Sequence, residues 1–341
     1  MVQMSQSHKN GLRIFFSATI AFLCLATVMR QVKFNELRSA LEIFDWGYFS
    51  LGLACLAFGY GLRIFRWNFI LKGMKSKVTF RQCATPFLGS VALNNMLPLR
   101  IGDGVRALIY PKKMNIRTSA GLSSLVLERV LDLIVLLIFF SLGVLNIGVV
   151  DVPRYVFISS YFLLLICAAL IITLVLLQQK RSRTLLLRIN QSGNQFATRI
   201  STLLLDALED LKNVMNFRSV SPIALMSIFI WFGESGVFFF VLQGFGLSAT
   251  IPIAILVTSI VSISTMVPSL PGYIGPFDLA AFLAITILGG SAAQSASFAL
   301  IAHLALWLPT TIVGLFAIGS DYEFFMSAKE ELSENKMVTK K

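Results

Sequence analysis

Residues 94–106 read NNMLPLRIGDGVR and close the short apolar run 83–98 with two asparagines and Pro98. Proline stops a helix because it lacks a backbone N–H and its ring collides with the preceding turn. Basic segments flank the run at 63–81 and 99–117, which predicts that it starts and finishes on the same side of a membrane. A short run that returns to its own side predicts a re-entrant helical hairpin broken at Pro98.

The amino-acid composition is typical of a membrane-embedded chain. Of 341 residues, 56% are hydrophobic and 13% are charged, whereas a soluble domain carries about 25% charged residues. A soluble protein of this composition would lack the polar surface needed to face water. The net charge of +12 comes from Lys and Arg between apolar runs. It therefore indicates membrane-surface charge and headgroup contacts, not nucleic-acid binding.

Apolar runs follow one another along nearly the whole chain. They predict an all-α polytopic membrane protein with about 7–9 hydrophobic segments, since a spanning helix needs about 20 residues. The runs are 12–29, 46–65, 83–98, 120–149, 155–177, 220–243, 251–267, 277–289 and 294–319. They form one predicted domain, 1–320, and the tail 321–341 is expected to fray in the cytoplasm. A signal peptide is disfavoured because no small-residue cleavage site precedes Gln31.

A polar insert, 178–219, separates the two halves of the chain. Its apolar residues recur at helical spacing, at Ile200, Leu203, Leu204, Ala207, Leu208 and Leu211. This predicts a basic amphipathic helix on the cytoplasmic face, with a docking site for a partner as the alternative. The same charge rule places both termini in the cytoplasm. The loop 30–45 fits poorly, because it must lie outside yet holds three basic residues beside its three acids.

The two halves also follow the same order. A helix, a hairpin and a second helix occur at 46–65, around Pro98 and at 120–149, and again at 220–243, around Pro268 and at 294–319. Met96, Pro98 and Gly102 match Met266, Pro268 and Gly272 at one offset of 170 residues. An odd number of crossings between the units would invert the second. This predicts an inverted repeat with two re-entrant or broken helices, the arrangement with which many transporters build a midplane site.

Charged residues interrupt the apolar run 120–149 near its start. Glu128 and Asp132 lie one turn apart and face the same side. Each buried charge costs about 2.5–3.5 kcal/mol in lipid, so both need partners, and Arg100 and Arg106 are the expected ones. Two interpretations stay open: a structural ion-pair network, or a polar cavity in which arginines bind a lipid phosphate. The candidate site residues here are Asn94, Arg100, Asp103, Arg106, Glu128, Arg129 and Asp132.

A second break is predicted in 268–278, PSLPGYIGPFD, where three prolines and two glycines exclude a continuous helix. Inside a membrane such backbone occurs only where it is buried in protein or lines a cavity. Asp278 is either a site residue or a helix N-cap. Glu234 has no basic neighbour within a turn, so it is either a cavity-lining, proton-coupling acid or a buried protonated one. The candidates from this half are Glu234, Pro268, Pro271, Gly272, Gly275 and Asp278.

Neither a cofactor nor a metal is expected. The four cysteines, Cys24, Cys55, Cys83 and Cys167, lack CxxC spacing and are predicted to be packing residues. His8 and His303 are far apart, no HExxH motif occurs, and His303 is predicted to be a packing residue as well. The sequence contains no Gly-rich Lys-Ser/Thr loop that would bind ATP. The acids of the first cluster have adjacent arginines, which makes a divalent-ion site there unfavourable.

These motifs, in this order, resemble the family of the lysylphosphatidylglycerol synthase transmembrane region, also called flippase-like or UPF0104. The family's Arg-Trp falls at Arg66-Trp67, and its Asn-x-x-x-Pro-x-Arg-x-Gly-Asp/Glu-x-x-Arg pattern falls at 94–106. Its Glu-Arg-x-x-Asp falls at 128–132 and its Pro-x-x-Pro-Gly-Gly-x-Gly-x-Phe-Glu at 268–278. Two positions depart from the pattern: Tyr273 replaces the second Gly, and Asp278 replaces the Glu with a shorter acid.

The resemblance implies a flippase-like protein of the bacterial cytoplasmic membrane. In the family this membrane domain is sometimes fused to an aminoacyltransferase and is associated with moving the product to the outer leaflet. Stand-alone relatives are associated with polyprenyl-linked sugars or hopanoids. About 20 residues follow the last predicted run, so no transferase domain and no enzyme activity are expected. The expected partners are membrane lipids and, in the alternative, a separate lipid-modifying synthase for which this chain is a scaffold. A lipid-phosphate enzyme would need a nucleophile or metal cluster that the sequence lacks.

Overall fold

The computed structural model describes residues 22–30, 34–147, 195–215, 217–247, 249–266 and 270–326, with isolated positions at 19, 161, 162, 165, 168, 169, 184 and 186–188. All regular structure in these residues is helical. Trp46–Gly73, Arg218–Gly244 and Ala292–Ser320 are long and apolar enough to cross a membrane. This confirms an all-α membrane protein. Cys167, most of the runs 12–29 and 155–177, and the tail beyond 326 lie outside the described residues.

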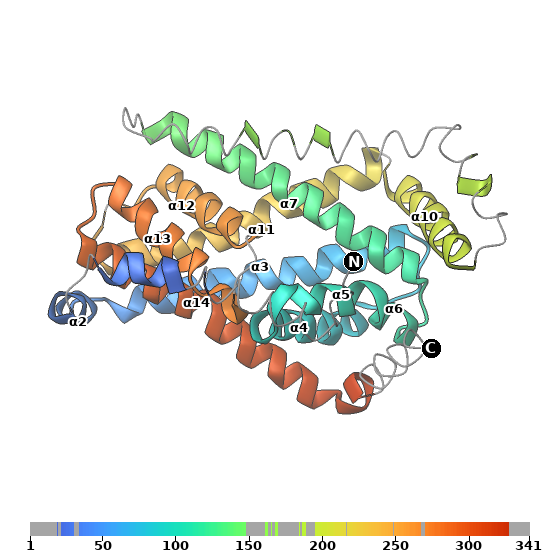
Figure 1. Ribbon diagram of the computed structural model, residues 1–341, viewed down its shortest axis with the longest axis horizontal. Coiled ribbons are helices and arrows are strands. Elements are labelled where there is room, and N and C mark those ends of the chain that lie inside the picture. The colour runs from blue at the N-terminus through green and yellow to red at the C-terminus, as the bar shows by residue number, and fades with distance from the viewer. Residues whose placement is uncertain are drawn as a thin grey trace, which may run out of the picture.

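The helices follow one another in two similar groups (Figure 1). The first group is α2 (Phe34–Glu42), α3 (Trp46–Gly73), α4 (Phe80–Met96), η1 (Pro98–Arg100), α5 (Ile101–Leu108), α6 (Tyr110–Lys113) and α7 (Thr118–Ile147). After α10 (Gln195–Val214), the second group is α11 (Phe217–Gly244), α12 (Ile251–Ser264), η2 (Pro271–Tyr273), α13 (Pro276–Ile287) and α14 (Ala292–Ser320).

The antiparallel pair of α3 and α11 forms the centre of the fold. Asp45 at the start of α3 donates its backbone N–H to the carbonyl of Gly244 at the end of α11, over 2.9 Å. Between these ends the backbones come very close, since a Cβ built on Gly233 would lie 3.0 Å from the carbonyl oxygen of Cys55. Small residues permit this close approach. Inside a membrane, helices associate mainly through the van der Waals packing that such an approach allows, because the hydrophobic effect does not act between them.

The first hairpin forms where the proline was expected to break the helix. Thr79 caps α4 in a capping box with Gln82, and the chain becomes extended at Leu97, before Pro98. Arg100 then adopts a left-handed conformation with φ 52°, which directs α5 back along α4. The prediction of a break at Pro98 is confirmed, and the returning arm is itself helical.

The second hairpin joins α12 to α13 through an irregular turn. Gly272, Tyr273 and Gly275 have positive φ angles of 76°, 62° and 100°. Glycine reaches this region without strain, whereas Tyr273 occupies it with a bulky side chain. The predicted non-helical backbone is confirmed for residues 270–275, and Pro268 lies outside the described residues.

Contacts between the two groups are reciprocal. Helix α7 of the first group packs on α12 of the second, and α14 of the second packs on α4 of the first. Within each group the returning arm packs on the last helix, α5 on α7 and α13 on α14, and η1 touches η2. Figure 1 shows α7 and α14 on opposite sides of the central pair. The two breaks therefore meet inside the bundle.

Helix α10 occupies the predicted amphipathic part of the insert. It packs on α7 and buries Ala207, Leu208 and Leu211, whereas Ile200 is exposed. Arg117 and Ser119, just before and at the start of α7, bind the buried carboxylate of Asp210. The apolar face that the sequence predicted thus covers a helix of the same chain.

Candidate functional site

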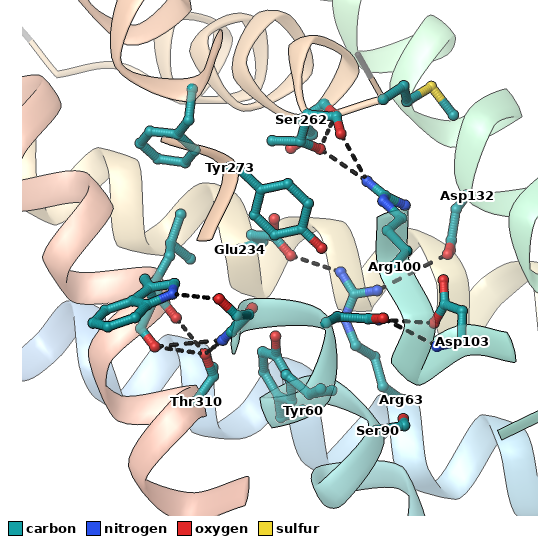
Figure 2. A pocket seen from close by; sticks show the side chains of 18 of the residues that line it. Tyr60, Arg63, Ser90, Arg100, Asp103, Asp132, Glu234, Ser262, Tyr273 and Thr310 are labelled. Carbon is teal, nitrogen blue, oxygen red and sulfur yellow. Dashed lines mark hydrogen bonds and ion pairs between the residues drawn. The ribbon is translucent and has the colours of Figure 1, made fainter. Parts of the chain in front are cut away.

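A cavity of about 190 Å³ lies where the two helix breaks meet (Figure 2). Residues from α3, α4, η1, α5, α7, α11, α12, η2, α13 and α14 line it. Its charged lining residues are Arg63, Arg100, Asp103, Arg106, Arg129, Asp132 and Glu234. Its aromatic lining residues are Tyr60, Phe87, Trp231, Tyr273, Phe277 and Trp307. Of the other sequence candidates, Asn94 and Gly272 also line the cavity.

Arg106 and Glu128 form a buried ion pair behind the cavity wall. Nη2 of Arg106 on α5 donates to Oε2 of Glu128 on α7 over 2.6 Å, and both side chains are almost fully buried. The Arg106 guanidinium also lies over the rings of Phe87 and Trp67, at 4.7 and 5.2 Å from the ring centroids. This confirms Arg106 as the partner of Glu128 and links the first hairpin to α7.

Asp132 pairs with an arginine that sequence reasoning had placed elsewhere. Arg66 on α3 donates from Nη1 and Nη2 to the two carboxylate oxygens over 2.6 and 3.2 Å, and Trp231 Nε1 donates to Oδ1 over 3.2 Å. The expectation that Arg100 and Arg106 are the partners of Glu128 and Asp132 therefore fails for Asp132. The sequence feature that could have identified Arg66 as a site residue was its place in the family's Arg-Trp motif, at Arg66-Trp67.

Glu234 also has a partner from α3. Arg63 donates to Oε2 of Glu234 over 2.6 Å, and its guanidinium lies 3.9 Å from Asp132 and 4.9 Å from the centre of the Trp231 ring. Arg63 and Arg66 had been counted with the basic segment 63–81. Both lie inside the 28-residue helix α3, one turn apart. Arg63 falls within the predicted run 46–65, and Arg66 lies just past its predicted end because the helix continues to Gly73.

Asp103 and Arg129 close the side of the cavity between α5 and α7. Arg129 Nη2 donates to Oδ2 of Asp103 over 2.8 Å. Asn94 holds the same aspartate twice, because its amide donates to Oδ1 and its oxygen accepts the backbone N–H of Asp103, each over 3.0 Å. The sequence candidates Asn94, Asp103 and Arg129 are therefore one connected group.

Arg100 is the exception among the cavity arginines. In the part of the chain that the structure describes, no carboxylate lies within ion-pair distance of it. Its Nη2 donates to the carbonyl and hydroxyl oxygens of Thr265 over 3.2 and 3.1 Å. Its guanidinium lies 5.3 Å from the centre of the Tyr273 ring, as Figure 2 shows. The expectation that Arg100 is a partner of the acids at 128 and 132 is therefore wrong.

Asp278 and His303 link the second hairpin to α14. His303 Nδ1 lies 2.7 Å from Oδ1 of Asp278, and Nε2 lies 2.8 Å from the carbonyl oxygen of Gly272. The other carboxylate oxygen accepts the backbone N–H of Gly275 over 2.9 Å. Asp278 thus does cap α13, as one interpretation held, and His303 is hydrogen-bonded at both ring nitrogens, as expected of a satisfied packing residue. Asp278, Pro271 and Gly275 support the cavity without lining it.

Asn95 joins the first hairpin to α14. Its side-chain amide donates to the hydroxyls of Thr310 and Thr311 over 3.0 and 2.9 Å. Its backbone carbonyl accepts the indole N–H of Trp307 over 3.3 Å. Asn95 was visible in the motif at 94–106 but was not a candidate.

Replacement of Asn95 by leucine is expected to lower the free energy of unfolding by about 1–3 kcal/mol, the range for two lost hydrogen bonds. The loss stays moderate because both threonine hydroxyls already donate to carbonyls of α14. Thermal unfolding of the purified protein measures it. Asn146→Leu is the control, since exposed Asn146 bonds only within α7. Equal stability of the two variants would contradict the link.

The acids that line the cavity are paired with arginines. Among the described residues, no group of three His, Cys, Asp or Glu side chains could hold a metal ion. The arginines instead place hydrogen-bond donors around a small space with aromatic walls. Such a space is chemically suited to an anion.

Comparisons with known proteins agree with the motifs. The sequence model of a family described as "Lysylphosphatidylglycerol synthase TM region" matches residues 14–314. A UPF0104 membrane protein of Methanothermobacter thermautotrophicus is 23% identical over 319 residues, which cover 89% of this chain and 92% of that relative. The matched range contains both helix breaks and every residue that lines the cavity.

Proposed function

Because the chain belongs to the family of the lysylphosphatidylglycerol synthase transmembrane region, we propose that it binds the anionic headgroup of a membrane lipid in this cavity and moves that lipid across the membrane. Arg100 carries the proposal. It is a cavity arginine without a described carboxylate partner, and it faces the space between the two hairpins. The planar guanidinium fork binds phosphate through two parallel hydrogen bonds.

The charge balance of the cavity favours one further negative charge. Ion pairs neutralise the other arginines: Arg63 with Glu234, Arg66 with Asp132, Arg106 with Glu128 and Arg129 with Asp103. Arg100 leaves one positive charge in a largely dehydrated setting, where an uncompensated charge is costly. An anionic headgroup would compensate it.

The size of the cavity suits a headgroup better than a whole lipid. Its volume of about 190 Å³ lies below the range of about 300–1,000 Å³ of pockets that enclose drug-sized ligands. That space accommodates a phosphate with a small substituent. The acyl or prenyl chains would stay in the bilayer while the headgroup crosses through the protein.

The helix arrangement supports movement of the headgroup. Helices α3 and α11 have 28 residues each, and the two groups exchange equivalent contacts. These features support the predicted inverted repeat. In transporters, inverted repeats place a binding site at the middle of the bilayer, and one repeat rocks against the other to open it to either side.

Three lipid classes fit the proposal: aminoacyl-phospholipids, polyprenyl-linked lipids and hopanoid-type lipids with a polar group. All combine a chain that stays in the bilayer with a headgroup that must be desolvated to cross. A cytoplasmic-membrane location with cytoplasmic termini belongs to the same proposal. It rests on the basic segments at 99–117 and 178–219.

Lipid binding by an Arg100→Gln variant tests the proposal. Anionic lipid retained by the gently purified protein is quantified by mass spectrometry. We expect binding about 10- to 150-fold weaker, the loss equivalent to a charge-assisted hydrogen bond of about 1.5–3 kcal/mol. Glutamine keeps a hydrogen-bond donor and removes the charge, so the unpaired guanidinium is what the experiment measures.

Arg81→Gln is the matched control, because it removes the same charge from an exposed position at the start of α4. It should retain the wild-type lipid. If wild type, control and Arg100→Gln all carry the same bulk lipid, Arg100 has no ligand-binding role. The scaffold interpretation would then take precedence.

A further inference from the structure

The contact between Asp278 and His303 constrains how many protons the pair holds. The carbonyl oxygen of Gly272 can only accept, so His303 Nε2, at 2.8 Å, must carry a proton. The remaining contact joins Nδ1 to a carboxylate oxygen over 2.7 Å. Without a proton between them, a nitrogen lone pair would face a carboxylate. The contact therefore needs one proton, on Nδ1 or on Oδ1, and in either form the pair is neutral.

The pair sits where a change of charge would affect the cavity. The side chains of His303 and Asp278 are 13% and 16% exposed, and His303 lines the cavity. Gly272, the acceptor from His303, is followed by Tyr273, whose ring lies 5.3 Å from the Arg100 guanidinium. The proton-holding pair and the unpaired arginine thus share one wall element, the turn at 271–275.

We infer that Asp278 and His303 form a binding site for one proton whose occupancy sets the affinity of the cavity for an anionic headgroup. The coupling rests on the proposed function, whereas the proton site does not. With the proton bound, the pair is neutral and Arg100 leaves the cavity with one positive charge. When the proton leaves Nδ1 or Oδ1 for solvent that enters the cavity, the pair becomes an anion. The net charge then falls to zero, and the headgroup loses its counter-charge.

Release of the proton also loosens the second hairpin. The pair holds the Gly272 carbonyl and the Gly275 N–H, both in positive-φ residues of the turn. With one proton fewer, the neutral imidazole has a single N–H and can donate to Asp278 or to Gly272 but not to both, so one of the two contacts must open. Linkage is reciprocal: if the proton strengthens headgroup binding, the headgroup must strengthen proton binding by the same factor.

The remaining charged and titratable groups around the pair are already accounted for. From the helix at 22–29, Cys24 interacts electrostatically with Asp278. Helix α12 presents no titratable side chain. The others, which line the cavity together with His303, are Tyr60 and Arg63 on α3, Arg100 on η1, Asp103 and Arg106 on α5, Arg129 and Asp132 on α7, Glu234 on α11 and Tyr273 on η2. The acids in this set have arginine partners, so His303 and Asp278 are the groups left to exchange a proton.

Histidine NMR tests the proton site directly. The chain has two histidines, so a His8→Gln variant labelled with ¹⁵N-histidine reports His303 alone. We expect both ring nitrogens to report a proton, Nε2 through its bond to Gly272 and Nδ1 through the proton shared with Asp278. Spectra recorded between about pH 5 and about pH 9, a window that brackets the usual titration range of histidine, follow the occupancy of that one proton. An Nδ1 that is unprotonated throughout, or that titrates identically in Asp278→Asn, would overturn the proton site.

Lipid binding tests the coupling. Retention of phosphatidylglycerol by protein in phosphatidylcholine nanodiscs is compared at about pH 6 and about pH 9. In wild type we expect retention to fall by about tenfold, equivalent to a modest coupling between two sites. In Asp278→Asn the amide can donate to Nδ1 and accept from Gly275 without a transferable proton. The ratio between the two pH values should therefore approach one.

The possible results separate the two claims. Retention at both pH values with equal ratios in wild type and Asp278→Asn would overturn the coupling and leave the proposed function intact. No retention by wild type at any pH would contradict the proposed function, and NMR would still decide the proton site. If Asp278→Asn does not fold, the wild-type ratio and the His303 titration decide.

Discussion

Replacement of Glu128 by leucine is expected to lower the free energy of unfolding by about 3–5 kcal/mol, because it leaves the charge of a buried arginine without its counter-charge. Arg106 has Glu128 as its ion-pair partner at 2.6 Å, and both side chains are almost fully buried. No other described carboxylate lies within ion-pair distance of Arg106, and Asp103 interacts with it only through space. Equilibrium unfolding in mixed micelles measures the loss.

The double variant Arg106→Met/Glu128→Leu separates charge from packing. Removing both charges should recover most of the stability, since apolar replacement of a whole buried ion pair is often neutral or stabilising. The Met sulfur can also take the place of the guanidinium against Phe87 and Trp67, which favour such contacts. A double variant less stable than Glu128→Leu would show that the ion pair itself stabilises the bundle.

An exposed pair provides the control for the same charge change. Arg38 and Glu42 form an i,i+4 pair on α2 with side chains 73% and 61% exposed. Exposed pairs of this kind contribute only about 0.3–0.5 kcal/mol. Glu42→Leu should therefore change the free energy of unfolding by no more than that. A similar loss for Glu42→Leu and Glu128→Leu would contradict the role of burial.

Replacement of Gly102 by alanine is expected to separate the two arms of the first hairpin. A Cβ there would lie 1.9 Å from the carbonyl oxygen of Ser90 and 2.9 Å from the backbone nitrogen of Asn94. Both are backbone atoms of α4, so they cannot move aside as the end of a flexible side chain could. Overpacking costs about 1–3 kcal/mol and occasionally more. We expect the free energy of unfolding to fall by an amount at the upper end of this range. The Asn94–Asp103 hydrogen bonds and lipid binding should be lost as well.

Gly104→Ala is the matched control, two residues further along α5. A Cβ there would meet nothing within 4 Å, and alanine favours a helix over glycine by about 0.5–1 kcal/mol. Gly104→Ala should therefore be neutral or slightly stabilising. Thermal unfolding and lipid retention of the two variants, compared side by side, measure the difference. Equal behaviour would show that α4 and α5 are not in contact as described.

Local features of the chain were readable from the sequence because their causes lie within a few residues. The break at Pro98 and the irregular turn at 270–275 follow from proline and glycine sterics. The amphipathic face of α10 follows from helical periodicity. Arg106 was also expected to be a partner of the acids at 128 and 132, because an unpaired charge is costly in lipid.

The pairings that define the cavity were decided by tertiary structure. Arg63 meets Glu234 across 171 positions and Arg66 meets Asp132 across 66, and both arginines had been assigned to a cytoplasmic segment. Charge counting cannot tell a loop arginine from one inside a helix that extends past its apolar run. Only the close packing of α3 on α11 places Arg63 beside Glu234.

The sequence by itself therefore determined that the chain is helical, apolar and broken at two points, since backbone sterics and hydrophobicity act locally. The tertiary structure decided that four arginines are neutralised while Arg100 is not, and that His303 shares a proton with Asp278. Which charge meets which depends on how separate helices pack, and a buried charge in a membrane is stable only beside the partner that packing brings to it.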